Sequence, residues 1–330
     1  MKKILIIGAS GFIGGFLVEE ALSRGYEVHA GVRSTSSRQY LSDKRIKFFE
    51  TELSDKEILK RKIKEIGRFD YVILNAGLKK TCNNEDFDTV NFYYTKNLAE
   101  ALIETGNTPD KFIYVSSLEA FGRGDEKTMQ PIKLSDKPNP QTFYGKSKLK
   151  TEKYLNSLNN FPNIIIRPTG VYGPRDTGYY LVYKSIKRGI ETYIGSRKQV
   201  LSFIYVKDLA RLIFDAAQSE ISYKGYFVSD LRKYTTEEFN KIVKKEMNKK
   251  ALRIVFPKAV VKILSFIIGE ISCLFGKPAI LNTEKYKIIS AGNWYCDSSE
   301  IVKDFGFKPE YELEKGIKET IVWFKEQNLL

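Results

Sequence analysis

The chain has 330 residues, of which 42% are hydrophobic and 28% charged, a balance typical of a globular protein and not of a fibrous or disordered one. Lysine and arginine exceed aspartate and glutamate by 14 charges, but no block of five consecutive basic residues occurs. We therefore expect a lysine-rich solvated surface and no nucleic-acid partner, although the charge also suits an anionic cofactor or an acidic membrane surface.

Strand and helix patterns alternate through the first half of the chain. Short apolar runs predict strands at 3–7, 27–32, 46–49, 71–74, 112–116 and 164–167. Helical spacing predicts helices near 12–24, 55–66, 86–105 and 143–158. Such alternation indicates an α/β fold, a Rossmann-type doubly wound parallel sheet, in which ligands bind beyond the carboxyl ends of the strands.

The first strand runs directly into three glycines spaced by three, within the segment 8–14. The first glycine allows a tight turn, the second lets a pyrophosphate approach backbone N–H groups, and the third permits close contact between helix and strand. A glycine-rich turn without a ligand is the alternative. We expect this loop to bind a dinucleotide through Gly8, Ser10, Gly11, Phe12, Ile13 and Gly14.

The end of the second strand bears on the choice of cofactor. NAD-selective proteins place an acidic residue there to bind the ribose 2′-OH, whereas this chain has Val32 followed by Arg33. An arginine at this position suits a 2′-phosphate. We therefore expect NADP(H) to be preferred, with NAD(H) as the alternative and a solvated loop arginine as the other interpretation of Arg33.

A serine, a tyrosine and a lysine form the candidate catalytic set. Ser117 ends the strand at 112–116, and 27 residues later Tyr144 and Lys148 begin a helix one turn apart, on one face. We expect the ammonium of Lys148 to lower the pKa of the Tyr144 phenol, which exchanges a proton with a substrate oxygen that Ser117 hydrogen-bonds. The chain has five Tyr-x-x-x-Lys pairs, but only this one follows a strand-terminal serine pair; an ordinary surface pair is the alternative.

Cysteine and histidine offer little chemistry in this sequence. Cys82, Cys273 and Cys296 have neither an even count nor metal-ligand spacing, and the first strand begins at once without a signal peptide. We therefore expect a cytoplasmic protein with reduced thiols and no metal. His29, the one histidine, lies on the second expected strand, where a structural role is expected.

The second half is less regular. We expect a dinucleotide-binding domain from 1–168 plus about 201–223, and a smaller substrate-binding lobe from about 169–200 and 224–330. The apolar segment 257–275 carries Lys262 and Glu270 and is short for a transmembrane span. An amphipathic helix over the substrate cleft is our first interpretation, with peripheral membrane contact or a subunit interface as alternatives.

Seven motifs in a fixed order resemble those of the extended short-chain dehydrogenases/reductases, of the NAD-dependent epimerase/dehydratase type. They are GASGFIG at 8–14, NAG at 75–77, Asn91 with Thr95, VSSLEAFG at 115–122, YGKSK at 144–148, RPTGVYGP at 167–174 and FIYVKD at 203–208. The resemblance implies that Ser117, Tyr144 and Lys148 are catalytic and that Ala76 and Gly77 line the cofactor. It further implies that Lys148 binds the nicotinamide ribose and that the chain forms a homodimer.

Departures from the family pattern concern the substrate, which we expect to meet Lys79, Asn91, Glu119 and Gly170. Nucleotide-sugar epimerases usually have Asn at the position of Gly170 and Arg at the position of Leu201. Sugar dehydratases have a catalytic Glu at the position of Glu119, but the Asp that precedes it is Leu118 in this chain. The later part of the chain is similar to the 3β-hydroxysteroid dehydrogenase and dihydroflavonol reductase branch.

This similarity favours hydride transfer between a nicotinamide and a ketone or secondary alcohol on a bulky substrate. The alternatives are a nucleotide-sugar epimerase or dehydratase and a dinucleotide sensor without catalysis.

Overall fold

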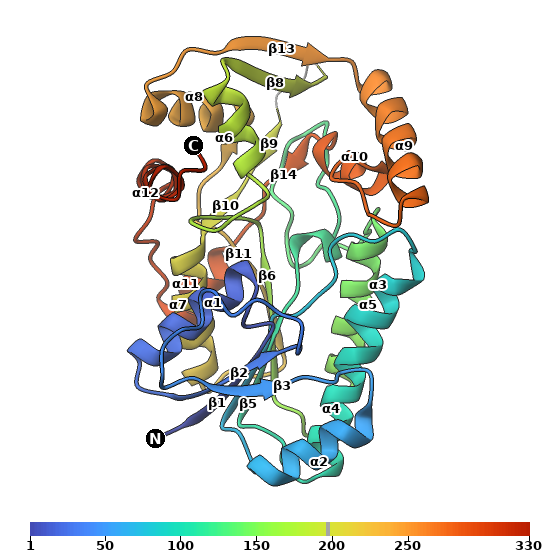
Figure 1. The fold of residues 1–330 in the computed structure, drawn as a ribbon, viewed down its shortest axis with the longest axis vertical. Helices are drawn as coiled ribbons and strands as arrows, with labels where there is room; N and C mark the ends of the chain where they lie inside the picture. The colour runs from blue at the N-terminus through green and yellow to red at the C-terminus, as the bar shows by residue number, and fades with distance from the viewer. Residues whose placement is uncertain (196–198) are drawn as a thin grey trace.

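The computed structural model describes residues 1–195 and 199–330, and its centre is a seven-stranded sheet (Figure 1). The strand order is β11-β6-β5-β4-β1-β2-β3, and every neighbouring pair is parallel. The strands are β1 (Lys3–Ile7), β2 (Glu27–Val32), β3 (Lys47–Glu50), β4 (Tyr71–Leu74), β5 (Lys111–Val115), β6 (Asn163–Pro168) and β11 (Lys224–Val228). The predicted Rossmann-type doubly wound sheet is confirmed.

Each face of the sheet carries its own helices because successive side chains of a strand point to opposite faces. Ile4 and Ile6 of β1 pack with the helices of one face, and Leu5 and Ile7 pack with those of the other. The first face holds α1 (Phe12–Ser23), α7 (Val206–Gln218) and α11 (Ser299–Phe305). The second holds α2 (Lys56–Ile66), α4 (Tyr94–Glu104) and α5 (Phe143–Ser157).

The sheet extends further along the chain than the sequence indicated. β11 pairs with β6 through Lys224 to Val228, so the seven-stranded sheet continues to Val228, past the position near 224 where we expected the lobe to resume. The reason is that β11 has the composition of any short buried strand, and only its pairing with β6 assigns it to this sheet.

The expected helix over 86–105 is divided into three parts. A short α3 (Glu85–Asp88) leads into the π-helical turn η1 (Thr89–Tyr93), which is followed by α4. A π turn accommodates one extra residue within a helix and is common beside functional sites. In this chain it contains Asn91, which is buried.

The smaller lobe has a core rich in aromatic side chains, shared by three helices from distant parts of the chain. These are α6 (Tyr180–Lys187), α8 (Thr236–Met247) and α12 (Leu313–Glu326). Small sheets surround them: β7 (Gly170–Tyr172) with β10 (Phe203–Tyr205), β8 (Ile190–Ile194) with β13 (Leu252–Phe256), and β9 (Val200–Leu201) with β12 (Tyr234–Thr235) and β14 (Asn293–Trp294). The pair α9 (Lys258–Leu274) and α10 (Thr283–Ile289) lies on the side of the lobe above α3 and α5 (Figure 1).

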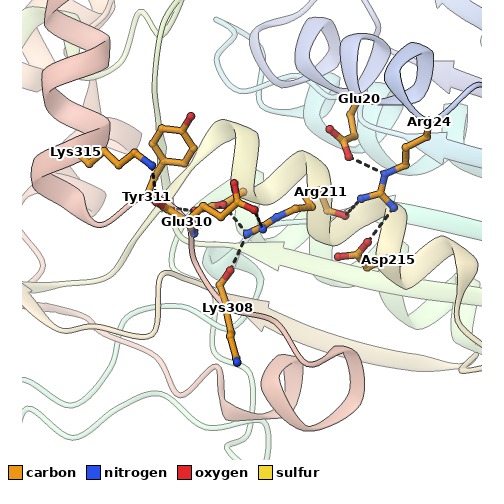
Figure 2. Close-up of polar contacts among 9 residues, drawn as sticks. Glu20, Arg24, Arg211, Asp215, Lys308, Glu310, Tyr311 and Lys315 are labelled. Carbon is orange, nitrogen blue, oxygen red and sulfur yellow. Dashed lines mark hydrogen bonds and ion pairs between the residues drawn. The ribbon is translucent and has the colours of Figure 1, made fainter.

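Charged side chains of α7 connect two other segments to the sheet domain (Figure 2). Arg24, after α1, donates to Asp215 of α7 at 2.9 Å. Arg211 of α7 donates to Asp208 at 2.7 Å and contacts Glu310. Asp208 also accepts hydrogen bonds from the backbone N–H groups of Glu310 and Tyr311 at 3.1 and 2.9 Å, so it fixes the segment that leads into α12.

The thiols differ from the expectation. Cys82 and Cys273 form a disulfide across 191 residues, so the prediction of three reduced thiols is wrong for this pair. The two cysteines are distant in sequence, and only the packing of α9 beside the loop after β4 brings them together. Cys296 is free and buried, and burial raises the pKa of its thiol to about 12. Within the described residues, no helix combines the length and apolar character needed to span a bilayer.

Candidate active site

The glycine loop after β1 is held by contacts that a larger residue would prevent. Gly8 has φ of +85°, and a Cβ atom there would lie 2.7 Å from the backbone nitrogen of Ala76. A Cβ atom on Gly14 would lie 2.1 Å from the carbonyl oxygen of Gly8. Both positions therefore require glycine, because loop, helix and neighbouring strand approach at backbone distance.

The same loop leaves the start of α1 open toward the carboxyl edge of the sheet. The residue before the helix is Gly11, which has no side chain to cap the first turn. The first N–H groups of a helix have no partner within it, and the helix dipole favours an anion there. The loop therefore fits the pyrophosphate of a nicotinamide dinucleotide. The Gly11 N–H already donates to the Gly8 carbonyl oxygen at 3.1 Å, so the backbone N–H groups of Phe12 and Ile13 and the nearby Ser10 are the groups that would bind it.

The end of β4 lies between the glycine loop and α5. Ala76 contacts Gly8 as described, and a Cβ atom on the exposed Gly77 would lie 3.2 Å from Lys148 Nζ and 3.1 Å from Asn91 Oδ1. The structure thus brings the predicted cofactor residues Ala76 and Gly77 beside both the glycine loop and Lys148.

The candidate catalytic residues come from two neighbouring elements. Ser117 follows β5 and begins the short helix η2 (Leu118–Ala120), where its hydroxyl accepts a hydrogen bond from Glu119 N at 3.2 Å. Tyr144 and Lys148 lie on the first turns of α5, with the Lys148 ammonium 5.8 Å from the centre of the Tyr144 ring. The structure therefore brings all three predicted residues together.

The pKa of Tyr144 differs from the expectation. Loss of solvent around the phenol and the negative charge of Glu119 raise its pKa above 10, and a hydrogen bond with Ser117 lowers it only in part. The predicted lowering by Lys148 is therefore not found in this structure. The raised pKa favours the protonated form of the phenol.

Lys148 is buried, and its pKa is lowered from the ordinary value for lysine. Its Nζ donates to the carbonyl oxygen of Val115 at 2.9 Å and lies 4.6 Å from the centre of the Tyr114 ring. Burial and the nearby ammonium of Lys79 lower the pKa of Lys148 to about 7.

Glu119 connects η2 to the beginning of α5. Its Oε2 accepts a hydrogen bond from Thr142 Oγ1 at 3.0 Å, and loss of solvent raises the pKa of its carboxyl group. A Cβ atom on Gly145 would lie 2.3 Å from the carbonyl oxygen of Glu119. The glycine between Tyr144 and Lys148 therefore lets the helix start touch η2, which places Glu119 beside the phenol.

Asn91, which we expected to contact substrate, is buried and hydrogen-bonded within the protein in this structure. It is 1% exposed, and its amide exchanges two hydrogen bonds with the backbone of Leu78 at 2.7 and 3.1 Å. The same amide donates to Ser147 Oγ at 2.9 Å. With its polar atoms satisfied inside the protein, Asn91 holds the loop after β4 against α5.

Two further predicted substrate residues, Gly170 and Lys79, lie near Tyr179 and Glu119 respectively. A Cβ atom on Gly170 would lie 2.3 Å from the Tyr179 hydroxyl, so this ring occupies the space that an asparagine side chain would need. Lys79 is exposed, and its positive charge lowers the pKa of Glu119 and of Asp176. Lys79 therefore lies within electrostatic reach of Glu119 and Asp176, whereas Gly170 makes room for Tyr179.

Two arginines lie near the adenosine end of the expected cofactor. Val32 is buried at the end of β2, and Arg33 is exposed on the loop that follows. Arg175, which the sequence analysis did not select, has its guanidinium 4.6 Å from the Phe16 ring and 4.2 Å from the Tyr40 ring.

Arg175 donates to Glu19 at 2.7 Å, but its Nε and Nη1 are buried without a hydrogen-bond partner among the described residues. It also has φ of +72°, an uncommon backbone conformation for arginine. Its position directly after the RPTGVYGP motif is the signal that could have identified it.

Comparisons with known proteins identify the family of this chain. Residues 4–226 match the profile of the NAD dependent epimerase/dehydratase family. A mouse sterol-4-alpha-carboxylate 3-dehydrogenase (decarboxylating) is 24% identical over 98% of this chain and 91% of its own length, and a UDP-glucose 4-epimerase of Vibrio cholerae is 26% identical over 99% and 97%. The crystal structure of a Thermus thermophilus UDP-glucose 4-epimerase in complex with NAD superposes with a TM-score of 0.77 at 23% identity, covering 98% of this chain and 99% of the other. The chain is therefore an enzyme that belongs to the NAD-dependent epimerase/dehydratase family.

Proposed function

We propose that this enzyme transfers hydride reversibly between a nicotinamide cofactor and a ketone or secondary alcohol on a bulky substrate. One observation carries the proposal. Tyr144 lies one turn before Lys148 on α5, with its ring centre 5.8 Å from Lys148 Nζ, and that Nζ approaches the strand end at Gly77. Burial and Glu119 raise the pKa of the Tyr144 phenol, which favours its protonated form. A proton donor at this position is what reduction of a carbonyl group requires.

In the direction of reduction, the substrate carbon gains a hydride and the substrate oxygen gains the phenol proton of Tyr144. The bound nicotinamide supplies the hydride in this direction and accepts it in the reverse one. Ser117 hydrogen-bonds the substrate oxygen, and Lys148 stabilises the phenolate that remains on Tyr144. The carbonyl C=O becomes CH–OH, and the phenolate regains a proton from solvent.

A bulky and fairly apolar substrate fits this chain better than a nucleotide sugar. The Tyr179 hydroxyl occupies the space beside Gly170, where nucleotide-sugar epimerases usually carry an asparagine. The mouse relative is named for its action on a sterol carboxylate. The preference for a large apolar substrate therefore rests on Tyr179 beside Gly170, since relatives of both classes cover almost the whole chain.

NADP(H) is the cofactor that the end of β2 favours. Val32 replaces the acidic residue that would repel a 2′-phosphate, and Arg33 is exposed beside it. We expect Arg33→Ala to lower the ratio of NADPH to NADH affinity about ten-fold. Arg38→Ala is the matched control, because Arg38 already stacks on Phe48 at 4.2 Å. An unchanged ratio in Arg33→Ala would exclude this preference.

The direct test of activity is a substrate screen. Purified protein is incubated with ketones, sterol-like alcohols and sugar nucleotides, and the absorbance of NADPH and NADH is followed separately. We expect net consumption of NADPH with an apolar ketone. Turnover of sugar nucleotides alone would refute the proposed substrate class.

A nucleotide-sugar epimerase or dehydratase is the second candidate, and Glu119 favours it. This carboxyl group, with its raised pKa, lies beside Tyr144 and supplies a second acid or base that hydride transfer alone does not need. Such an enzyme oxidises and reduces its substrate on one retained cofactor. Cofactor that copurifies with the protein and is not consumed during turnover would support this candidate.

A further inference from the structure

The helix α9 carries its large apolar residues on its exposed side, whereas an ordinary surface helix buries them. The residues on its inner side are Val261, Ser265 and Gly269, spaced by four, and they are the buried ones. Two of these three are small, and a Cβ atom on Gly269 would lie 3.3 Å from Asn282 at the start of α10. A helix that packed only for stability would turn its large apolar residues to this side.

Large apolar residues instead cover the outer side of α9. Ile263 is 60% exposed, Ile271 51% and Leu274 85%. These three, with Val260 and Ile267, follow one another at intervals of three or four residues and so form a stripe opposite the buried side. Further exposed apolar residues extend the surface over the end of α9 and over β13: Leu264, Phe266, Ile268, Phe275, Ile280, Leu252, Val255 and Phe256.

This surface, which we call the α9 face (residues 252–280), lies in a basic part of the chain. Between residues 249 and 287 the sequence has eight lysines and arginines against two glutamates. Among them, Lys262 and Lys277 are exposed on α9 and directly after it. An apolar stripe with basic residues around it is complementary to the acyl chains and anionic headgroups of a lipid surface.

We propose that the α9 face binds the surface of an anionic membrane, with α9 lying in the plane of the interface. A second copy of this chain fits the face less well. A symmetric contact through α9 would set the same basic groups opposite one another, whereas anionic lipid neutralises them.

The α9 face is joined to the active site by two contacts. Cys273 near the end of α9 is disulfide-bonded to Cys82, which lies on the loop that also carries Gly77 and Lys79. Glu284 of α10 accepts a hydrogen bond from the backbone N–H of Phe143 at 2.6 Å, one residue before Tyr144. A membrane bound to α9 would therefore lie on the side of the molecule that carries the loop after β4 and the start of α5. If the proposed function holds, this places the membrane near the residues expected to act on an apolar substrate.

Sedimentation with vesicles tests this proposal. The full chain is mixed with phosphatidylcholine vesicles, with and without phosphatidylglycerol. We expect the protein to sediment with the anionic vesicles, more weakly with phosphatidylcholine alone, and less as salt is added. Ile263→Gln/Ile267→Gln should weaken binding about ten-fold or more, because each substitution removes an apolar side chain from the lipid.

The matched control is Val302→Gln/Val322→Gln, which makes the same kind of change at two exposed valines of α11 and α12, away from the α9 face. Circular dichroism and NADPH binding confirm that both variants are folded. The proposal is overturned if the wild-type chain stays in the supernatant with anionic vesicles. It is equally overturned if the chain forms a dimer in analytical ultracentrifugation that Ile263→Gln/Ile267→Gln dissociates, without any binding to vesicles.

Discussion

Thr142 donates a hydrogen bond to Glu119 Oε2 at 3.0 Å, and the same hydroxyl accepts one from Gly145 N at 2.9 Å. A single side chain therefore caps α5 and holds the carboxyl group that raises the pKa of Tyr144. Thr142 therefore links the first turn of α5 to the Glu119 carboxyl group that lies beside the Tyr144 phenol.

Replacing Thr142 and comparing the free energy of unfolding with turnover tests whether this residue affects catalysis as well as capping α5. Thr142→Val should lower the free energy of unfolding by about 1 kcal/mol, the usual cost of a lost N-cap. It should also raise the pKa of Glu119, which loses a hydrogen bond to its carboxylate, and slow turnover. Thr235→Val is the matched control, because Thr235 caps α8 in the same way but lies in the other lobe. Equal turnover of both variants, measured at equal folded fraction, would show that Thr142 only caps its helix.

The pKa of Lys148 predicts how stability depends on pH. Burial lowers this pKa from 10.5 to about 7, so between these values the unfolded chain binds a proton that the folded protein does not. The free energy of unfolding should therefore rise with pH across this window, by at most about 1.4 kcal/mol per pH unit. In Lys148→Met this contribution is absent.

Urea denaturation of both proteins over this range of pH measures the difference. We expect the wild type to gain stability relative to Lys148→Met as the pH rises above about 7. Parallel pH profiles would show that the Lys148 pKa is not lowered in the folded protein.

A buried ion pair beneath the site supports α5. Arg167 of β6 donates to both carboxylate oxygens of Glu152, with Nη2 to Oε2 at 2.9 Å, and both side chains are under 10% exposed. Arg167→Met should cost about 3–5 kcal/mol, because Glu152 is left charged and buried. The double variant Glu152→Met/Arg167→Met should recover much of this loss. Additive losses in a urea-denaturation cycle would show that the two residues do not interact.

Counting thiols tests the connection between α9 and the active-site loop. In denaturant without reductant, the chain should show one reactive thiol, Cys296, and after reduction it should show three. Reduction should lower the free energy of unfolding by about 2–5 kcal/mol, because the bond closes a long loop. Cys296→Ser should show no reactive thiol before reduction. Three thiols in the unreduced protein would mean that Cys82 and Cys273 are not bonded.

The sequence predicted those parts of the molecule that depend on local patterns. The strands β1, β2, β4, β5 and β6 are short, largely buried runs, and the glycine loop needs glycine for backbone reasons visible in the spacing alone. Ser117, Tyr144 and Lys148 come together because the carboxyl edge of a parallel sheet brings strand ends and helix starts to one place.

Long-range packing explains what the sequence did not predict. β11 is assigned by its pairing with β6, and Cys82 meets Cys273 only after α9 has folded against the loop that follows β4. The raised pKa of Tyr144 likewise arises from Glu119 and from the loss of solvent, neither of which a Tyr-x-x-x-Lys spacing contains. The position of the Arg175 guanidinium likewise depends on its packing against Phe16 and Tyr40, which lie in other segments of the chain.

The central claim is that Tyr144 supplies the proton for hydride transfer, and Tyr144→Phe tests it most directly. The measurement is the single-turnover rate of NADPH oxidation with the ketone found in the screen, together with NADPH affinity. We predict that the rate falls about a hundred- to ten-thousand-fold while the affinity for NADPH stays within about two-fold of the wild type. A Tyr144→Phe enzyme that oxidises NADPH at the wild-type rate would contradict the account.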